Sequence, residues 1–206
     1  MRDVGRITSD AGDAFAQGWA SAQQLVDFFG RGGALTPTFA PGLVLQPGEG
    51  FLFQVDATHA RLYVLDGSYE RTGTFVFGSL GLIGASLATT ALVNSSRKNR
   101  AALNTIPVWR DQQPCSVAVT TERLMVGLRG VGFQSFGYRA VQEFHADPDN
   151  WAVVLGFPDV VPLRLSGPSS AYLGVFLARQ LYPEQWQQHP LIGRLGRAST
   201  PVIDQD

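Results

Sequence analysis

The chain has 206 residues, of which 45% are hydrophobic and 16% charged, and its formal net charge is -1. This composition excludes a disordered chain and gives no sign of nucleic-acid binding. The lone cysteine, Cys115, excludes an internal disulfide and metal sites built on cysteine pairs, and it fits a reducing, cytoplasmic location. The N-terminus mixes charges without a following apolar run, so we expect no secretion signal.

Residues 13–29 predict an amphipathic helix, which glycines at 30, 32 and 33 would end. The apolar residues that recur at spacings of three and four, and so share one face, are Phe15, Trp19, Ala22, Val26 and Phe29. The polar face carries glutamine rather than lysine, which favours packing on the protein's own domain over contact with an anionic membrane. With the Pro/Gly-rich linker that follows, residues 1–44 are predicted to lie outside the main domain.

Two strand-like runs come next. Apolar residues alternate over 51–55, and residues 61–65 form a second, shorter run. Asp66-Gly67 then predicts a turn.

Residues 75–93 contain no charged residue, and a basic run follows them. This length is at the lower end of what spans a bilayer, and the basic run would place the C-terminal end of such a helix in the cytoplasm. The candidate contacts to anionic lipid headgroups are Arg97, Lys98, Arg100 and Arg110. The alternative is that these residues are solvated cations in the C-terminal half of a helix.

Small residues four positions apart occur within the same stretch, where they would let two helices approach closely. The candidates for helix packing or self-association are therefore Gly81, Gly84, Ala85 and Ala88. We expect a helix here that continues to Pro107, so that residues 72–114 form a helical insertion.

After the insertion, turn residues separate five predicted strands, over residues 116–126, 132–138, 140–145, 151–157 and 161–165. A helix follows, with Ser166 or Ser169 as its cap, and Tyr182-Pro183 ends it. Residues 183–206 are predicted to be a flexible tail. The fold class is therefore α+β, with an antiparallel sheet or barrel, an N-terminal helix, a helical insertion and a closing C-terminal helix.

This order resembles the pleckstrin-homology (PH) fold, a twice-bent antiparallel sheet closed at one end by a C-terminal helix. The motifs similar to those of bacterial PH-like and GRAM-like domains are Pro47-Gly48-Glu49, residues 119–124 (VTTERL), Phe136-Gly137-Tyr138 with Val141, and residues 162–167 (PLRLSG). The resemblance implies one domain over residues 45–182. The whole chain also resembles a group of bacterial proteins with the same Gly/Ala-rich insertion and basic run, which supplies no function.

The resemblance also bears on ligands. PH domains that bind phosphoinositides hold the phosphates with basic residues in the loop between the first two strands. We expect that loop at residues 56–60, where only His59 and Arg61 could help, so the usual inositol-phosphate site is not expected.

The sequence offers no constellation that predicts an enzyme. The histidines, His59, His145 and His189, have no catalytic pattern around them, and no cofactor or metal motif is present. Cys115 is expected to be buried, and Arg123 to form a structural salt bridge with Glu122 or a neighbouring strand.

We therefore expect a non-enzymatic PH-like binding or scaffolding module that binds a protein partner or itself, with an anionic membrane surface as a further contact. The alternative is a membrane-anchored protein with a transmembrane helix at 75–93 and a cytoplasmic PH-like region. A single crossing would separate the two parts of one sheet, which favours the first interpretation.

Overall fold

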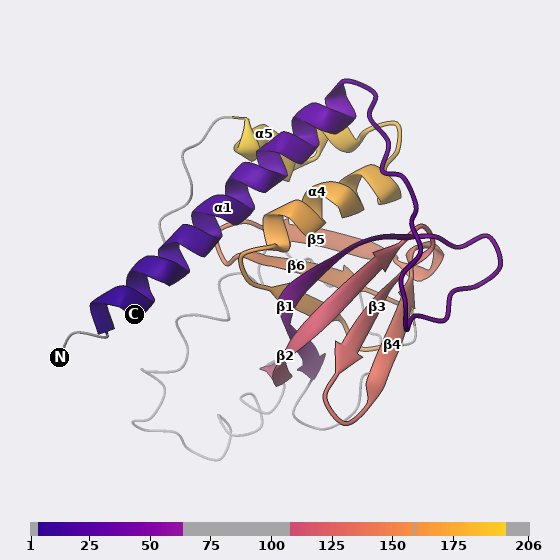
Figure 1. The fold of residues 1–206 in the computed structure, drawn as a ribbon, viewed down its shortest axis with the longest axis horizontal. Helices are drawn as coiled ribbons and strands as arrows, with labels where there is room; N and C mark the ends of the chain where they lie inside the picture. Colours follow the sequence, from indigo (N-terminus) through magenta and orange to yellow (C-terminus); the bar gives the residue numbers. More distant parts are fainter. Residues whose placement is uncertain (1–3, 64–107, 159, 197–206) are drawn as a thin grey trace, which may run out of the picture.

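The structure, a computed structural model, describes residues 4–63, 108–158 and 160–196. Figure 1 shows its elements, which are α1 (Val4–Gly30), β1 (Phe51–Tyr63), β2 (Val108–Thr120), β3 (Arg123–Leu128), β4 (Gly132–Gly137), a 3-10 turn (Tyr138–Ala140), β5 (Glu143–Asp147), β6 (Ala152–Gly156), β7 (Leu163–Ser166), α4 (Ser170–Leu181), a second 3-10 turn (Trp186–Gln188) and α5 (Pro190–Leu195). The predicted α+β class is confirmed.

The strands form one open, seven-stranded sheet in the order β4-β3-β2-β1-β7-β6-β5, and every neighbouring pair is antiparallel. β1 lies at its centre, paired with β2 over its length and with β7 near its C-terminal end. The β1–β2 pairing begins at Phe51↔Thr120 and ends at Tyr63↔Val108. These two ends of the sheet have different surroundings.

Helices cover the end at Phe51↔Thr120. The Phe53 ring contacts Tyr172 and Phe176 of α4, with centroids 5.1 and 5.2 Å apart. α1 lies across α4 on the side away from the sheet (Figure 1). A Cβ added at Gly18 of α1 would lie 2.0 Å from the Pro168 carbonyl oxygen, so only glycine permits this approach. We call this the helix-covered end.

The N-terminal helix packs on its own domain, as predicted, because Trp19, Ala22 and Phe29 are buried. The Trp19 ring lies 5.7 Å from that of Trp151, which ties α1 to the residue before β6. Its start at residue 13 was predicted too late, since α1 begins at Val4.

Two predictions on strands were wrong. The runs at 51–55 and 61–65 are not separate, because residues 51–63 form the continuous strand β1 with two register shifts. Residues 116–126 are not one strand, because the chain turns between β2 and β3. The Thr120 hydroxyl accepts hydrogen bonds from the backbone N–H groups of Glu122 and Arg123, at 3.2 and 3.0 Å. A side chain thus stabilises a turn that has neither glycine nor proline.

The predicted insertion ends too late, since β2 already begins at Val108 and residues 108–114 are strand. Pro114 is tolerated there because β3 pairs with β2 only from Ser116 onwards, so no second ladder needs the missing N–H. The predicted flexible tail is also wrong over 183–196. Trp186, Leu191 and Leu195 are buried there, and the Gln23 side chain of α1 donates to the Leu195 carbonyl at 2.8 Å.

Among the described residues, no helix has both the length and the apolar character needed to cross a membrane. The charge-free stretch 75–93 lies outside these residues.

Candidate functional site

Most of the site residues predicted from sequence lie outside the described residues: Gly81, Gly84, Ala85, Ala88, Arg97, Lys98 and Arg100. Arg110 is the exception. It is exposed on β2, directly opposite Arg61 of β1. The Tyr63↔Val108 pair also brings the two ends of segment 64–107 together at one place.

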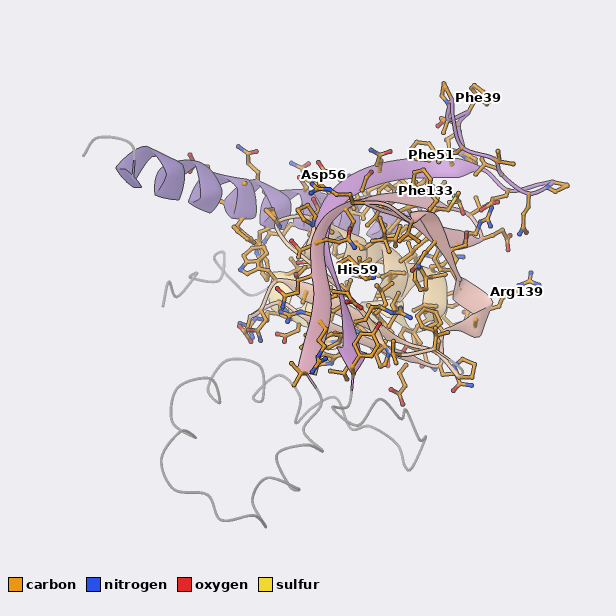
Figure 2. All side chains as sticks on the ribbon, turned by 90° about the horizontal axis from the view of Figure 1, so that it is seen from below. Phe39, Phe51, Asp56, His59, Phe133 and Arg139 are labelled. Carbon is orange, nitrogen blue, oxygen red and sulfur yellow. The ribbon has the colours of Figure 1, made fainter. Side chains whose placement is uncertain are left out.

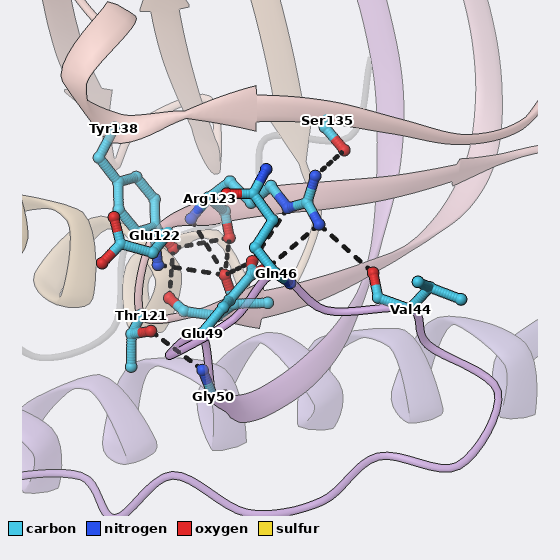
Figure 3. Close-up of polar contacts among 10 residues, drawn as sticks. Val44, Gln46, Glu49, Gly50, Thr121, Glu122, Arg123, Ser135 and Tyr138 are labelled. Atoms are coloured by element: carbon cyan, nitrogen blue, oxygen red, sulfur yellow. Dashed lines mark hydrogen bonds and ion pairs between the residues drawn. The ribbon is translucent and has the colours of Figure 1, made fainter.

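A closed polar cluster lies at the helix-covered end (Figure 3). The Arg123 Nε and Nη2 groups donate to the two Glu49 carboxylate oxygens, at 2.9 and 3.0 Å. The Thr120 hydroxyl donates to Glu49 Oε1 at 2.6 Å, and the Gln46 backbone N–H to Oε2 at 2.7 Å. Arg123 Nη1 donates to the Ser135 hydroxyl at 3.1 Å, so each nitrogen of this guanidinium has a partner.

The predicted structural salt bridge of Arg123 is therefore confirmed, but its partner is neither Glu122 nor a residue of a neighbouring strand. The partner is Glu49, whose side chain is fully buried and which lies in the turn before β1. Tyr138 closes the cluster, since its hydroxyl contacts the Thr120 and Arg123 carbonyls at 2.9 and 3.0 Å. The cluster fixes three chain segments against one another.

Burial alone would raise the pKa of Glu49. The hydrogen bonds from Gln46, Thr120 and Arg123, together with the positive charge of Arg123, outweigh it and hold the pKa below its ordinary value. Glu49 is therefore ionised at neutral pH, as a salt-bridge partner of Arg123 must be.

At the other end of the sheet, the inward-pointing residues of β1 include a charged side chain. Alternate residues of β1 point inward, as shown by the buried core residues opposite them: Cys115 opposite Ala57, Leu165 opposite His59 and Leu163 opposite Arg61. This inward row therefore starts at Phe53 beneath α4 and ends at Arg61, far from the helices. We call the end at Tyr63↔Val108 the open end.

Arg61 lines a cavity of about 510 Å³ at the open end, although only 7% of its surface is exposed. Its guanidinium carbon lies 5.3 Å from the centre of the Phe136 ring, a cation–π contact. Its Nη1 atom is buried, and the residues that the structure describes offer it no hydrogen-bond partner. Burial lowers the pKa of Arg61, and electrostatic interactions with Tyr63 and Asp111 partly offset this effect. Arg61 remains a cation at neutral pH because guanidinium is so basic.

The cavity lies between the two outer parts of the sheet. Apart from Arg61, its walls come from β4, from the residues that follow β4 and from the residues that follow β6. They include Gln134, Phe136, Ala140, Phe157, Pro158 and Val160. The rings of Phe136 and Phe157 lie 5.5 Å apart, so they form a continuous aromatic wall.

A bulge in β2 shapes the same end. Asp111 has φ +56°, and the register shifts between His59 and Arg61. The Asp111 carbonyl lies 3.2 Å from His59 Nδ1, and its carboxylate accepts from the Tyr63 hydroxyl at 2.8 Å. Burial lowers the pKa of His59, whose Nε2 has no hydrogen-bond partner within the described part of the chain.

The expected first loop at residues 56–60 was therefore wrong, because these residues lie inside β1 and the β1–β2 connection is segment 64–107. Figure 2 shows His59 on the strand itself. The composition of residues 56–60 consequently gives no argument against an inositol-phosphate site.

Two other candidates are structural. Cys115 is buried, as predicted, and burial raises its pKa to about 11, so the thiol is unreactive at neutral pH. His189 precedes α5, and its Nδ1 atom accepts a hydrogen bond from the Leu191 N–H at 3.3 Å.

Sequence reasoning missed Arg61 as an interior cation. The available signal was its position next to Leu62 and Tyr63 in an apolar run, where a charge is unexpected. That run does not show which side chains of β1 point into the protein, because the bulge in β2 and the end of β1 cannot be located from the sequence.

No protein-family model matches the sequence, and neither does any curated protein.

Proposed function

We propose that the protein is a non-enzymatic, PH-like binding module whose β1–β2 connection is the contact element. It binds a protein partner or a second copy of itself, with an anionic membrane surface as a further contact. The observation that carries this proposal is the Tyr63↔Val108 pair, which makes segment 64–107 leave and rejoin the sheet at one point.

Support for the PH-like assignment comes from the sheet and from its motifs. The order of the strands, all antiparallel and followed by a helix that covers one end, agrees with the plan that the resemblance implies. Two of the motifs that carry the resemblance also meet in space. Glu49 belongs to the first and Thr120 and Arg123 to the second, and all three join in one cluster.

The same pair argues against the membrane-anchored alternative. A helix at 75–93 that crossed once would leave its two ends on opposite sides, whereas Tyr63 and Val108 are adjacent in the sheet. A return crossing would carry Arg97, Lys98 and Arg100 through the bilayer, at about 2.5–3.5 kcal/mol for each charge at its centre. The pairing therefore favours peripheral contact.

Membrane contact is tested by flotation with vesicles that contain anionic lipid. We expect the wild type to float with them and to be released by carbonate. The Arg97/Lys98/Arg100→Gln variant should float less. The control, Arg31/Arg129/Arg139→Gln, removes the same charge from exposed positions elsewhere and should float like the wild type. Retention of the wild type after carbonate treatment would instead support the anchored alternative.

Self-association is tested by light scattering on the wild type and on Gly84→Leu. We expect an oligomer whose dissociation constant rises at least tenfold in the variant, because leucine would block close approach of small residues. A control, Gly12→Leu, changes an α1 glycine that has open space around it. If the wild type neither assembles nor captures a partner nor binds vesicles, the binding-module proposal fails.

A further inference from the structure

Arg61 is a buried cation whose counter-charge the described fold does not supply. Among the described residues, its Nη1 atom has no hydrogen-bond partner and no carboxylate forms a salt bridge with it. The nearest candidate named by its electrostatics is Asp111, whose Oδ2 atom already accepts from the Tyr63 hydroxyl. Folding an unpaired charge into the interior is unfavourable, so such a residue calls for an anion.

We propose that the open-end cavity binds a small amphipathic organic anion, with its oxyanion head on Arg61 and its apolar body against Phe136 and Phe157. This site is separate from the proposed contact element, because it uses interior residues of β1, β4 and the chain after β6.

The geometry at Arg61 suits an oxyanion. Guanidinium presents its N–H donors in a planar fork that matches carboxylate and phosphate oxygens. The face of the Arg61 guanidinium is occupied by the Phe136 ring, while Nη1 is left as the unused donor. The edge of the guanidinium, rather than the face that Phe136 covers, is therefore the part that offers donors to a head group.

A second cation lies on the neighbouring strand β2. Arg110 is the cross-strand partner of Arg61, and residues paired in this way have Cβ atoms about 4.5–5.5 Å apart. Like charges directly opposite each other destabilise a sheet, and an anion at the cavity mouth would relieve the repulsion. Arg110 is exposed, so it can attract the ligand while Arg61 holds it.

The other lining residues determine which kind of ligand body the cavity accepts. Phe136, Phe157 and Pro158 offer apolar surface, and about 510 Å³ is within the range of small-molecule sites. Gln134 and Ser135 are the other polar side chains in the lining, and the Ser135 hydroxyl already accepts from Arg123. The site therefore fits one anionic head on an apolar chain or ring, rather than a polyanion or a sugar.

Calorimetric titration of the full chain with decanoate and with octyl phosphate tests the proposal, and decanol serves as the uncharged control. We expect one site for at least one of the two anions, and the tighter of them identifies the head group. Decanol should bind much more weakly. Arg61→Met should reduce affinity roughly 10- to 100-fold, the loss typical of a charge-assisted hydrogen bond. Arg129→Met, at an exposed arginine, should leave affinity unchanged.

A second variant guards against misfolding of the first. Val160 is 45% exposed at the cavity lining, so Val160→Trp should fold and obstruct the cavity without touching Arg61. It should also weaken binding at least tenfold. Absence of binding by either anion to the wild type would overturn the proposal. So would binding that survives in both variants, or decanol binding as tight as the anions.

Discussion

The two ends of the β1–β2 pairing each place an arginine inside the protein, yet they treat it differently. At the helix-covered end, Arg123 is 17% exposed and its nitrogens donate to Glu49, Ser135 and Val44. At the open end, Arg61 is 7% exposed, and its Nη1 atom donates to no residue within 4–63, 108–158 and 160–196. The more deeply buried arginine is the one with an unpartnered nitrogen in the described part of the chain, which is the reverse of what stability alone would select.

The difference separates a structural arginine from a binding one. The Arg123 cluster joins the turn before β1 to the β2–β3 turn and β4, and each guanidinium nitrogen of Arg123 has a partner. Arg61 faces a cavity with aromatic walls. Charge does not distinguish the two residues, but their hydrogen bonds do.

The largest expected effect comes from breaking the closed cluster. Glu49→Ala should lower the free energy of unfolding by about 3 kcal/mol, since it leaves Arg123 and Thr120 without their shared acceptor. Urea unfolding measures this loss. The control, Glu122→Ala, removes the exposed carboxylate of the residue next to Arg123 and should change stability by less than about 0.5 kcal/mol. Equal effects of the two variants would contradict a structural role for the cluster.

The next largest effect is expected from a substitution that tests how closely α1 packs at the helix-covered end. Gly18→Ala should lower the free energy of unfolding by about 2 kcal/mol, because the added methyl would collide with the Pro168 carbonyl. Gly12→Ala makes the same change in the same helix where no atom lies within 4 Å. That variant should gain up to about 1 kcal/mol from helix propensity. If Gly18→Ala is also stabilising, α1 does not pack on Pro168 as described.

The most direct comparison makes one substitution at both ends. Arg61→Met should raise the free energy of unfolding by about 1 kcal/mol without ligand, because it removes an unpaired buried charge and keeps the length of the side chain. Arg123→Met should lower it, because Glu49 would stay buried without its cation. Urea unfolding of both variants decides the matter, and a loss of stability in Arg61→Met would show that its charge is already satisfied.

The smallest effect is in the pH dependence. Because the pKa of Glu49 in the folded protein lies below its ordinary value near 4.5, its ionisation stabilises the fold above that pH. This contribution is lost as the pH falls through the folded-state value. Glu49→Gln should therefore flatten the acid side of the stability curve below about pH 4.5 relative to the wild type. An unchanged slope would show that Glu49 titrates alike in both states.

Local patterns predicted the elements that depend on near neighbours. The face of α1 around Trp19 and Ala22 followed from its periodicity, as did the strands near 132–138 and 151–157. The β2–β3 turn escaped prediction because a Thr120 side chain replaces the usual glycine or proline. The packed structure of residues 186–195 was not predicted either, since Leu191 and Leu195 are buried by contact with distant elements.

The sequence by itself determined an α+β chain with an antiparallel sheet, one helix before the sheet and one helix after it. It also predicted that Arg123 forms a structural salt bridge. Only the tertiary structure decided which arginine was satisfied. Glu49 and Arg123 are 74 positions apart, and Arg61 meets Phe136 through the pairing of four strands. Hydrogen bonds and cavities depend on these long-range contacts, whereas periodicity records only which face of one element is buried.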